Sequence, residues 1–253
     1  MTMAFIRTLA FALAATLAVL HHAAADEAKV AKPMAVVELF TSQGCSSCPS
    51  ADAFLGELAR RDDVIALSQH VAYWDYIGWK DPFALSEATD RQRDYQRLFN
   101  LRYVYTPQMV INGVEQEVGS SRPQVLAKIE KAKALPQVPI GLGPGAKGGV
   151  KIQIGRAPDA DSFKFDKDAV VWMIAFDARH DTKIPRGENG GRTLANFNVV
   201  RRIERIGEWK GEAATIWVRT PEKGEPGSDA CAVIVQSTKS GRVLGAAQMA
   251  LAK

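Results

Sequence analysis

Apolar and polar positions follow two kinds of pattern along residues 34–135. Runs rich in β-branched residues predict buried strands, and segments with apolar residues three or four apart predict helices. In chain order they are strand 34–41, helix 49–61, strand 63–74, a helix from about residue 83 to 100, strands 108–113 and 114–120, and helix 122–135. This order predicts a mixed sheet with helices packed against it, an α/β domain over residues 34–135.

The pattern changes after residue 135. Residues 136–149 (PQVPIGLGPGAKGG) are rich in proline and glycine and predict a domain boundary. The apolar runs beyond them are β-rich, separated by turn signals, and without an amphipathic helix; they cover residues 150–155, 168–178, 194–209, 213–220, 231–237 and 242–251. We therefore predict a smaller all-β, antiparallel sandwich-like domain over residues 148–253.

The first 25 residues have the pattern of a secretory signal peptide. Arg7 precedes an apolar run of 12 residues, Leu9 to Leu20, and Ala23 and Ala25 form an A-x-A ending. That run is shorter than the roughly 20 residues that span a bilayer. We expect cleavage after Ala25, export to the periplasm or beyond, and no membrane span in the mature chain; the alternative is an uncleaved anchor.

Export changes what the three cysteines of the chain can do. In an oxidising compartment a pair of thiols can persist as a disulfide. Three cysteines are too few for a disulfide-built scaffold, so stability must come from hydrophobic cores. Removing Arg7 from the 32 basic residues leaves 31 against 28 acidic ones, without a basic block, which argues against a nucleic-acid partner.

Two cysteines stand in the sequence CSSC, between the first predicted strand and the first predicted helix. If that helix begins around Ser46, Cys45 occupies its N-cap, where free N–H groups and the helix dipole stabilise a thiolate. This placement predicts a lowered pKa for Cys45, which makes it the nucleophile. Cys48 then lies one turn deeper, is less exposed, and is the expected resolving thiol.

Two other interpretations of the pair stay open. Zinc or a soft metal ion could be held by Cys45, Cys48 and His70, although a second ligand pair at metal spacing is missing. An inert structural disulfide is the other possibility, although a two-residue loop constrains the unfolded chain very little. The third cysteine, Cys231, is expected to be a buried core residue.

A Thr-Pro pair, Thr106-Pro107, lies directly before a predicted strand and about 60 residues beyond the cysteines. Together with the strand–CxxC–helix unit, it resembles the thioredoxin superfamily, and residues 35–134 follow that order of elements throughout. The resemblance implies that Pro107 is a cis-proline facing the cysteines and that Thr106 offers its backbone to an extended substrate. Ser46-Ser47 departs from the residue pairs of thioredoxins and glutaredoxins, so the resemblance does not fix a redox potential.

Three further features bear on the expected site. Thioredoxins carry a buried acid on the preceding strand, and Glu38 matches it, one residue further from the first cysteine; burial would raise its pKa and make it a proton relay, unless it faces solvent. Trp74, in the aromatic loop 72–83, is expected to wall a substrate groove, unless the rings only pack the loop onto the core. The glycine-rich segment 185–198 is expected to be a hairpin loop, or one that lines the thiol cleft with Arg192 nearby.

Four longer stretches resemble the secreted bacterial proteins grouped as domain of unknown function 1223. They are VVELFTSQGCSSCPSAD (36–52), HVAYWDYIGWKDPF (70–83), TPQMVING (106–113) and GENGGRTLANFNVVRRIERIGEW (187–209). The resemblance covers nearly all of the mature chain. It implies a thioredoxin-like domain with an appended β domain, but no substrate.

These observations predict a periplasmic or secreted thiol–disulfide oxidoreductase that uses Cys45 and Cys48 on exported proteins or small thiols. An unidentified redox partner would recycle it. No nucleotide or flavin fingerprint is evident, so no cofactor is expected. The alternative is a non-catalytic binding protein of the same fold, whose cysteine pair is a structural disulfide or holds a soft metal ion.

Overall fold

The structure, a computed structural model, describes residues 34–145, 149–158 and 168–251. The expected signal peptide, residues 1–25, lies outside the described residues. In the described part of the chain, no helix combines the length and the apolar character needed to cross a membrane.

The predicted order of elements over residues 34–135 is confirmed. It runs β1 (Ala35–Thr41), α1 (Pro49–Leu58), β2 (Val64–His70), the short 3-10 helix η1 (Ala72–Trp74), α2 (Ser86–Leu98), β3 (Gln108–Ile111), β4 (Glu115–Val118) and α3 (Arg122–Lys133). Strand β1 pairs in parallel with β2 and antiparallel with β3, and β3 forms a hairpin with β4. Asn112 and Gly113 of that hairpin both have positive φ, as the turn signal predicts.

The structure differs from the predicted elements in three places. The second strand ends at His70, and η1 takes the place of its last residues. Helix α2 begins at Ser86 rather than near Phe83, because Asp81 accepts the Phe83 N–H in a turn before it. The segment 136–149 contains strand β5 (Ile140–Pro144), which pairs with β6, so this segment is not a simple linker.

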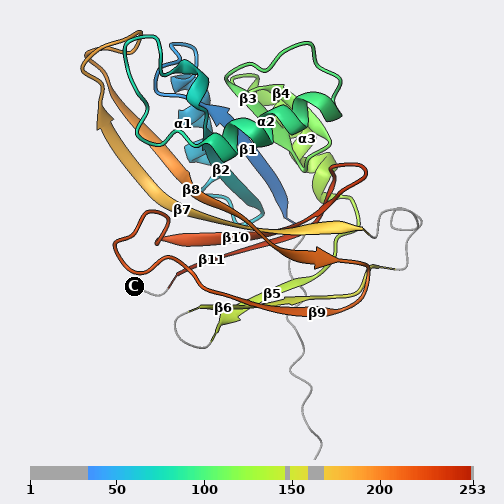
Figure 1. Cartoon of the computed structure of the whole chain (residues 1–253). Coiled ribbons are helices and arrows are strands. Elements are labelled where there is room, and N and C mark those ends of the chain that lie inside the picture. Colours follow the sequence, from blue (N-terminus) through green and yellow to red (C-terminus); the bar gives the residue numbers. More distant parts are fainter. Residues whose placement is uncertain (1–33, 146–148, 159–167, 252–253) are drawn as a thin grey trace, which may run out of the picture.

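The strands that follow residue 135, here called the β-rich half, are divided between two sheets. Its strands are β5, β6 (Val150–Ile154), β7 (Ala169–Lys183), β8 (Thr193–Trp209), β9 (Ala214–Val218), β10 (Ala230–Ser237) and β11 (Val243–Ala250). One eight-stranded sheet has the order β11-β10-β7-β8-β2-β1-β3-β4, and β5-β6-β9 form a small antiparallel sheet. Figure 1 shows the helices at one end of the molecule, the small sheet at the other, and the long strands β7 and β8 running between them.

The join between the halves corrects part of the expectation of an appended all-β, sandwich-like domain, because four of its strands belong to the same sheet as β1 and β2. Strand β8 pairs in parallel with β2 at Ser68 and Val199. A strand at the edge of a sheet exposes unpaired N–H and C=O groups, and β8 covers that edge of β2. Two sheets do pack face to face, as in a sandwich, in one part of the molecule. There the small sheet packs on β7, β10 and β11 through a cluster around Ile152, Val171 and Trp209.

The two faces of β1 pack against different helices, which decides where the site lies. Val37 and Leu39 face the cluster that contains α1 and α3. Val36 joins a cluster with strands of the β-rich half, and Phe40 packs beside Tyr95 of α2. Side chains alternate along a strand, so Thr41 lies on the α1 face and Glu38 on the α2 face.

Candidate functional site

A disulfide joins Cys45 and Cys48 in the turn between β1 and α1, with their Cα atoms 5.5 Å apart. The helix begins at Pro49, and Cys48, not Cys45, is its N-cap residue. Pro49 is favoured at this first position because its missing N–H needs no partner there. The residues before it form a turn, in which the Cys48 N–H donates to the Cys45 carbonyl.

Both sulfurs are buried in this disulfide. Cys45 and Cys48 are each 0% exposed, whereas Ser46 and Ser47 between them are exposed. The expectation that Cys45 is the more exposed member is therefore wrong. The Ser47 hydroxyl lies 3.3 Å from Cys45 Sγ, where it can donate to that sulfur.

The loop between β7 and β8 covers the cysteine turn. The Asn189 side-chain amide donates to the carbonyl oxygens of Gln43 and Cys45, each at 2.9 Å. The Glu188 carboxylate accepts the Ser46 N–H at 3.1 Å. Arg192 donates to the Asn189 side-chain oxygen at 2.9 Å. The segment 185–198 therefore contacts the backbone of the cysteine turn, with Arg192 nearby.

The expected substrate-binding residues gather beside the same turn. The Thr106–Pro107 peptide bond is cis. The Trp74 indole N–H donates to the Thr106 hydroxyl at 2.8 Å, and Trp74 also packs against Gly44. A side chain at Gly119 would touch both Pro107 and Ala51, so Pro107 lies close to the first turn of α1.

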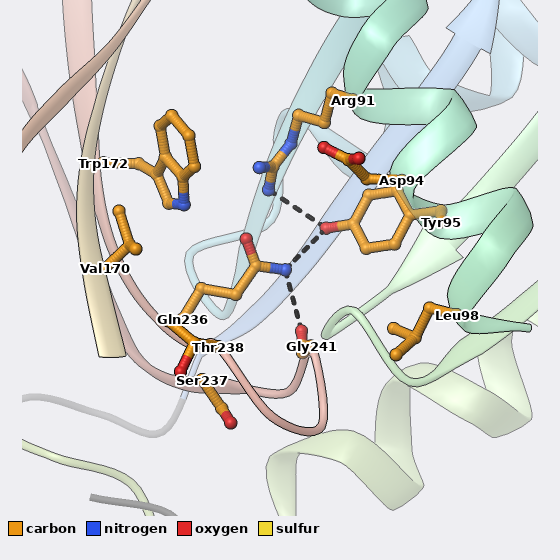
Figure 2. Close-up of a pocket in the computed structure, with 10 residues that line it drawn as sticks. All are labelled: Arg91, Asp94, Tyr95, Leu98, Val170, Trp172, Gln236, Ser237, Thr238 and Gly241. Carbon is orange, nitrogen blue, oxygen red and sulfur yellow. Dashed lines mark hydrogen bonds between the residues drawn. The ribbon is translucent and has the colours of Figure 1, made fainter. Parts of the chain in front are cut away.

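Glu38 lies on the other face of the sheet, away from α1. Its carboxylate accepts hydrogen bonds from Arg91 at 2.6 and 2.9 Å, from the Tyr95 hydroxyl at 2.6 Å and from Gln69 at 3.1 Å. Arg91 and Tyr95 line a cavity of about 290 Å³ between α2 and the strands β7 and β10. Figure 2 shows Arg91, Tyr95 and Gln236 turned toward one another in it. This network ties α2 to both halves of the sheet.

Asp52, which the sequence analysis did not single out, is the buried acid on the cysteine side. It follows Cys48 by one helical turn and accepts a hydrogen bond from the Thr41 hydroxyl at 2.9 Å. Burial raises the pKa of Asp52 to about 7, against the opposing attraction of His70. The available signal was its position, four residues after Cys48 on the same helix.

A buried ion pair lies next to Asp52. His70 Nδ1 is 2.7 Å from the Asp81 carboxylate, and both side chains are fully buried. Burial alone would lower the pKa of His70, but the attraction of Asp81 raises it above its ordinary value. The same Asp81 oxygen accepts the Gln43 N–H, which links this pair to the segment before Cys45.

Asp52 also borders a cavity. A cavity of about 440 Å³ between α1 and β8 is lined by Pro49, Asp52, Arg60 and Arg192, among others. As for metals, no group of three or more His, Cys, Asp and Glu side chains that could hold an ion was found within residues 34–145, 149–158 and 168–251.

Comparison with known proteins places the chain in a family. No curated protein gave a match. Among solved structures, protein AGR_C_4864 from Agrobacterium tumefaciens is 30% identical, over 85% of this chain and 93% of that chain, with a TM-score of 0.71. HBP35 of Porphyromonas gingivalis shares the fold at 13% identity and a TM-score of 0.53, over 87% of this chain and 76% of that chain. The model of a family described as protein of unknown function (DUF1223) matches residues 36–236, and the chain belongs to that family.

Proposed function

We propose that this protein is an exported thiol–disulfide oxidoreductase whose redox pair is Cys45 and Cys48. The observation that carries the proposal is the disulfide in the turn before α1, close to Trp74 and to the cis bond of Thr106–Pro107. Its substrates would be thiols or disulfides of exported proteins or of small molecules. The export itself rests on the signal-peptide pattern of residues 1–25.

We further infer that residues 34–135 form a thioredoxin-like unit. The support is the order β1-α1-β2-α2-β3-β4-α3 and the strand order β2-β1-β3-β4, in which β3 runs against β1. A cis-proline directly before β3 and a cysteine pair directly before α1 fit the same unit.

The chemistry in the oxidising direction takes two exchange steps. A substrate thiolate attacks Cys45 Sγ, the Cys45–Cys48 bond breaks, and a mixed disulfide forms while the electron pair leaves on Cys48. A second substrate thiolate then attacks the substrate sulfur of that mixed disulfide, which releases the substrate disulfide and leaves Cys45 as a thiolate. Two substrate thiols are oxidised and one protein disulfide is reduced; the reverse sequence, with Cys48 resolving, reduces a substrate disulfide.

Asp52 takes the proton-relay role that the sequence resemblance gave to Glu38. Cys48 needs a proton when it leaves and must lose one when it attacks. A buried carboxyl group with a pKa of about 7, one helical turn away, can supply and accept that proton near neutral pH. Glu38, held by Arg91 and Tyr95 on the α2 face, is in our proposal a structural residue that joins the two halves.

A second candidate function follows from the buried sulfurs. Because Cys45 and Cys48 are both 0% exposed, thiol exchange requires displacement of the segments that cover them. A disulfide that never opens would instead be a structural cross-link, and the protein a binding module with a thioredoxin-like scaffold. The two functions differ in whether the pair turns over.

The test is turnover of an external disulfide with the purified mature protein. We expect the wild type to catalyse reduction of insulin by dithiothreitol. The rate with Cys45→Ser should be lower by about tenfold or more, because the reacting sulfur of Cys45 is absent. Cys48→Ser should accumulate a mixed disulfide at Cys45, visible by mass spectrometry. Cys231→Ala, which changes a buried cysteine outside the pair, is the control. Turnover by Cys45→Ser at the wild-type rate would eliminate the proposal, and a wild type without turnover would favour the binding module.

A further inference from the structure

Both polar groups of the Asn189 side chain are hydrogen-bonded, and its amide nitrogen joins the β7–β8 loop to the cysteine turn. Asn189 is only 1% exposed, and both hydrogens of its amide group go to the cysteine turn, at the Gln43 and Cys45 carbonyls. Its oxygen accepts from Arg192. Because a buried amide with unmet partners is costly, this geometry fixes the loop and the turn relative to each other.

The side chain of Gln43 also joins the segment before Cys45 to neighbouring elements. Its side-chain nitrogen donates to the Asn196 oxygen of β8 at 3.0 Å, and its side-chain oxygen accepts the Trp79 indole N–H at 3.1 Å. The residues that lead into Cys45 are thus bonded to the β7–β8 loop, to β8 and to the loop after β2. These bonds hold the segment next to Cys45, whose side chain is 0% exposed.

Glu188 adds a charge effect. Its carboxylate occupies the N–H of Ser46, the residue next to Cys45. When the disulfide is reduced and Cys45 becomes a thiolate, a second negative charge lies close to the first. Like charges disfavour ionisation, so Glu188 stabilises the disulfide relative to the thiolate form.

We propose that Asn189 and Glu188 are positioning residues that set the rate and the equilibrium of exchange at Cys45–Cys48. This inference rests on the proposed function, which it deepens. Asn189 slows attack by keeping the cysteine turn closed, and Glu188 shifts the equilibrium toward the disulfide. Together they make the pair a poor oxidant in the resting protein, and they restrict exchange to thiols able to displace the β7–β8 loop.

The equilibrium arm uses Glu188, whose exposed side chain can be changed without disturbing the core. We expect Glu188→Gln to shift the equilibrium with reduced and oxidised glutathione toward the dithiol about threefold, which is about 14 mV at 29.6 mV per decade. Glu188→Asp should stay near the wild type, and Glu222→Gln, an exposed acid elsewhere, is the control. An equilibrium for Glu188→Gln equal to that of the wild type would overturn the role of Glu188.

The kinetic arm uses Asn189. We expect Asn189→Ala to raise the second-order rate of disulfide reduction by dithiothreitol about tenfold or more, measured by quenching with a maleimide and mass spectrometry. Thr193→Ala, an exposed change at the start of β8, should leave that rate unchanged. Equal rates for Asn189→Ala and the wild type would overturn the role of Asn189.

The two proposals fail separately, because these measurements follow the protein's own disulfide rather than its turnover of a substrate. A wild type that reduces no insulin, but whose disulfide opens faster in Asn189→Ala, would refute the proposed function alone. If the wild type reduces insulin, but Glu188→Gln has the wild-type equilibrium and Asn189→Ala the wild-type rate, this inference alone is refuted. A disulfide that resists dithiothreitol in both the wild type and Asn189→Ala contradicts the role of Asn189.

Discussion

The pKa of Asp52 is raised because its position on α1 buries the carboxyl group. Burial beneath the cysteine turn raises its pKa to about 7, although His70 and the Thr41 hydroxyl both favour the charged form. In the unfolded chain the same carboxyl group is solvated and has its ordinary pKa of 3.8. The fold therefore binds a proton that the unfolded chain releases between these two values.

This difference predicts how stability depends on pH. Stability linked to Asp52 is fully present below its unfolded pKa and is lost as the pH rises to about 7. The loss is about 1.4 kcal/mol per pH unit, on the order of 4 kcal/mol in all. Because Asn has no charge to bury, Asp52→Asn should gain stability relative to the wild type between pH 4 and 7, and level off above pH 7. Urea unfolding across that pH range checks it, and a difference that does not vary with pH contradicts the assigned pKa.

Helix α1 is held against β8 by a glycine inside the helix. An added Cβ at Gly56 would lie 2.5 Å from the Phe197 ring of β8. Glycine in a helix interior normally costs stability relative to alanine, so its presence here reflects close packing rather than helix propensity. The contact fixes the helix that carries Asp52 and starts beside Cys48.

Gly56→Ala should therefore destabilise the protein by about 1–3 kcal/mol, although helix propensity alone predicts a gain. In a Phe197→Ala background the clash is absent, and the same change should become neutral or stabilising. Denaturant unfolding of the four proteins gives the coupling directly. Ser50→Ala, on the exposed side of α1, controls for propensity, and additive effects of Gly56→Ala and Phe197→Ala would contradict the packing argument.

At the scale of the whole molecule, one eight-stranded sheet contains strands of both halves. Val36, Ile65 and Leu67 share a buried cluster with Ile174 and Ile234 of the β-rich half. The backbone supports the same join, because the Val243 N–H donates to the Asn112 carbonyl at 2.9 Å. The halves are therefore expected to unfold together.

Truncating Ile234 tests that cooperativity. The side chain is 0% exposed, so Ile234→Ala should cost about 2–4 kcal/mol. Hydrogen exchange should then accelerate in peptides from β1 and β2 as well as from β10. Leu126→Ala, a partly exposed position on α3, serves as the control. Faster exchange confined to the β-rich strands would mean that the halves unfold independently.

Several parts of this picture were predictable from sequence because they depend on short-range patterns. The order of elements up to residue 135 follows from hydrophobic periodicity, and the Asn112-Gly113 turn from the φ values that glycine and asparagine tolerate. The face of Glu38 was not predictable in this way. Every residue of β1 is buried, so no alternation of apolar and polar positions shows which side chains face α1.

The sequence by itself determined that Cys45 and Cys48 lie within disulfide reach, because a two-residue spacing before a helix brings them together whatever surrounds them. Only the tertiary structure decided that β8 covers the edge of β2, that Asn189 closes over the cysteine turn, and that Asp52 is the acid buried beside it. These features join residues far apart in the chain. Their energies come from burial and hydrogen bonds that no local pattern encodes.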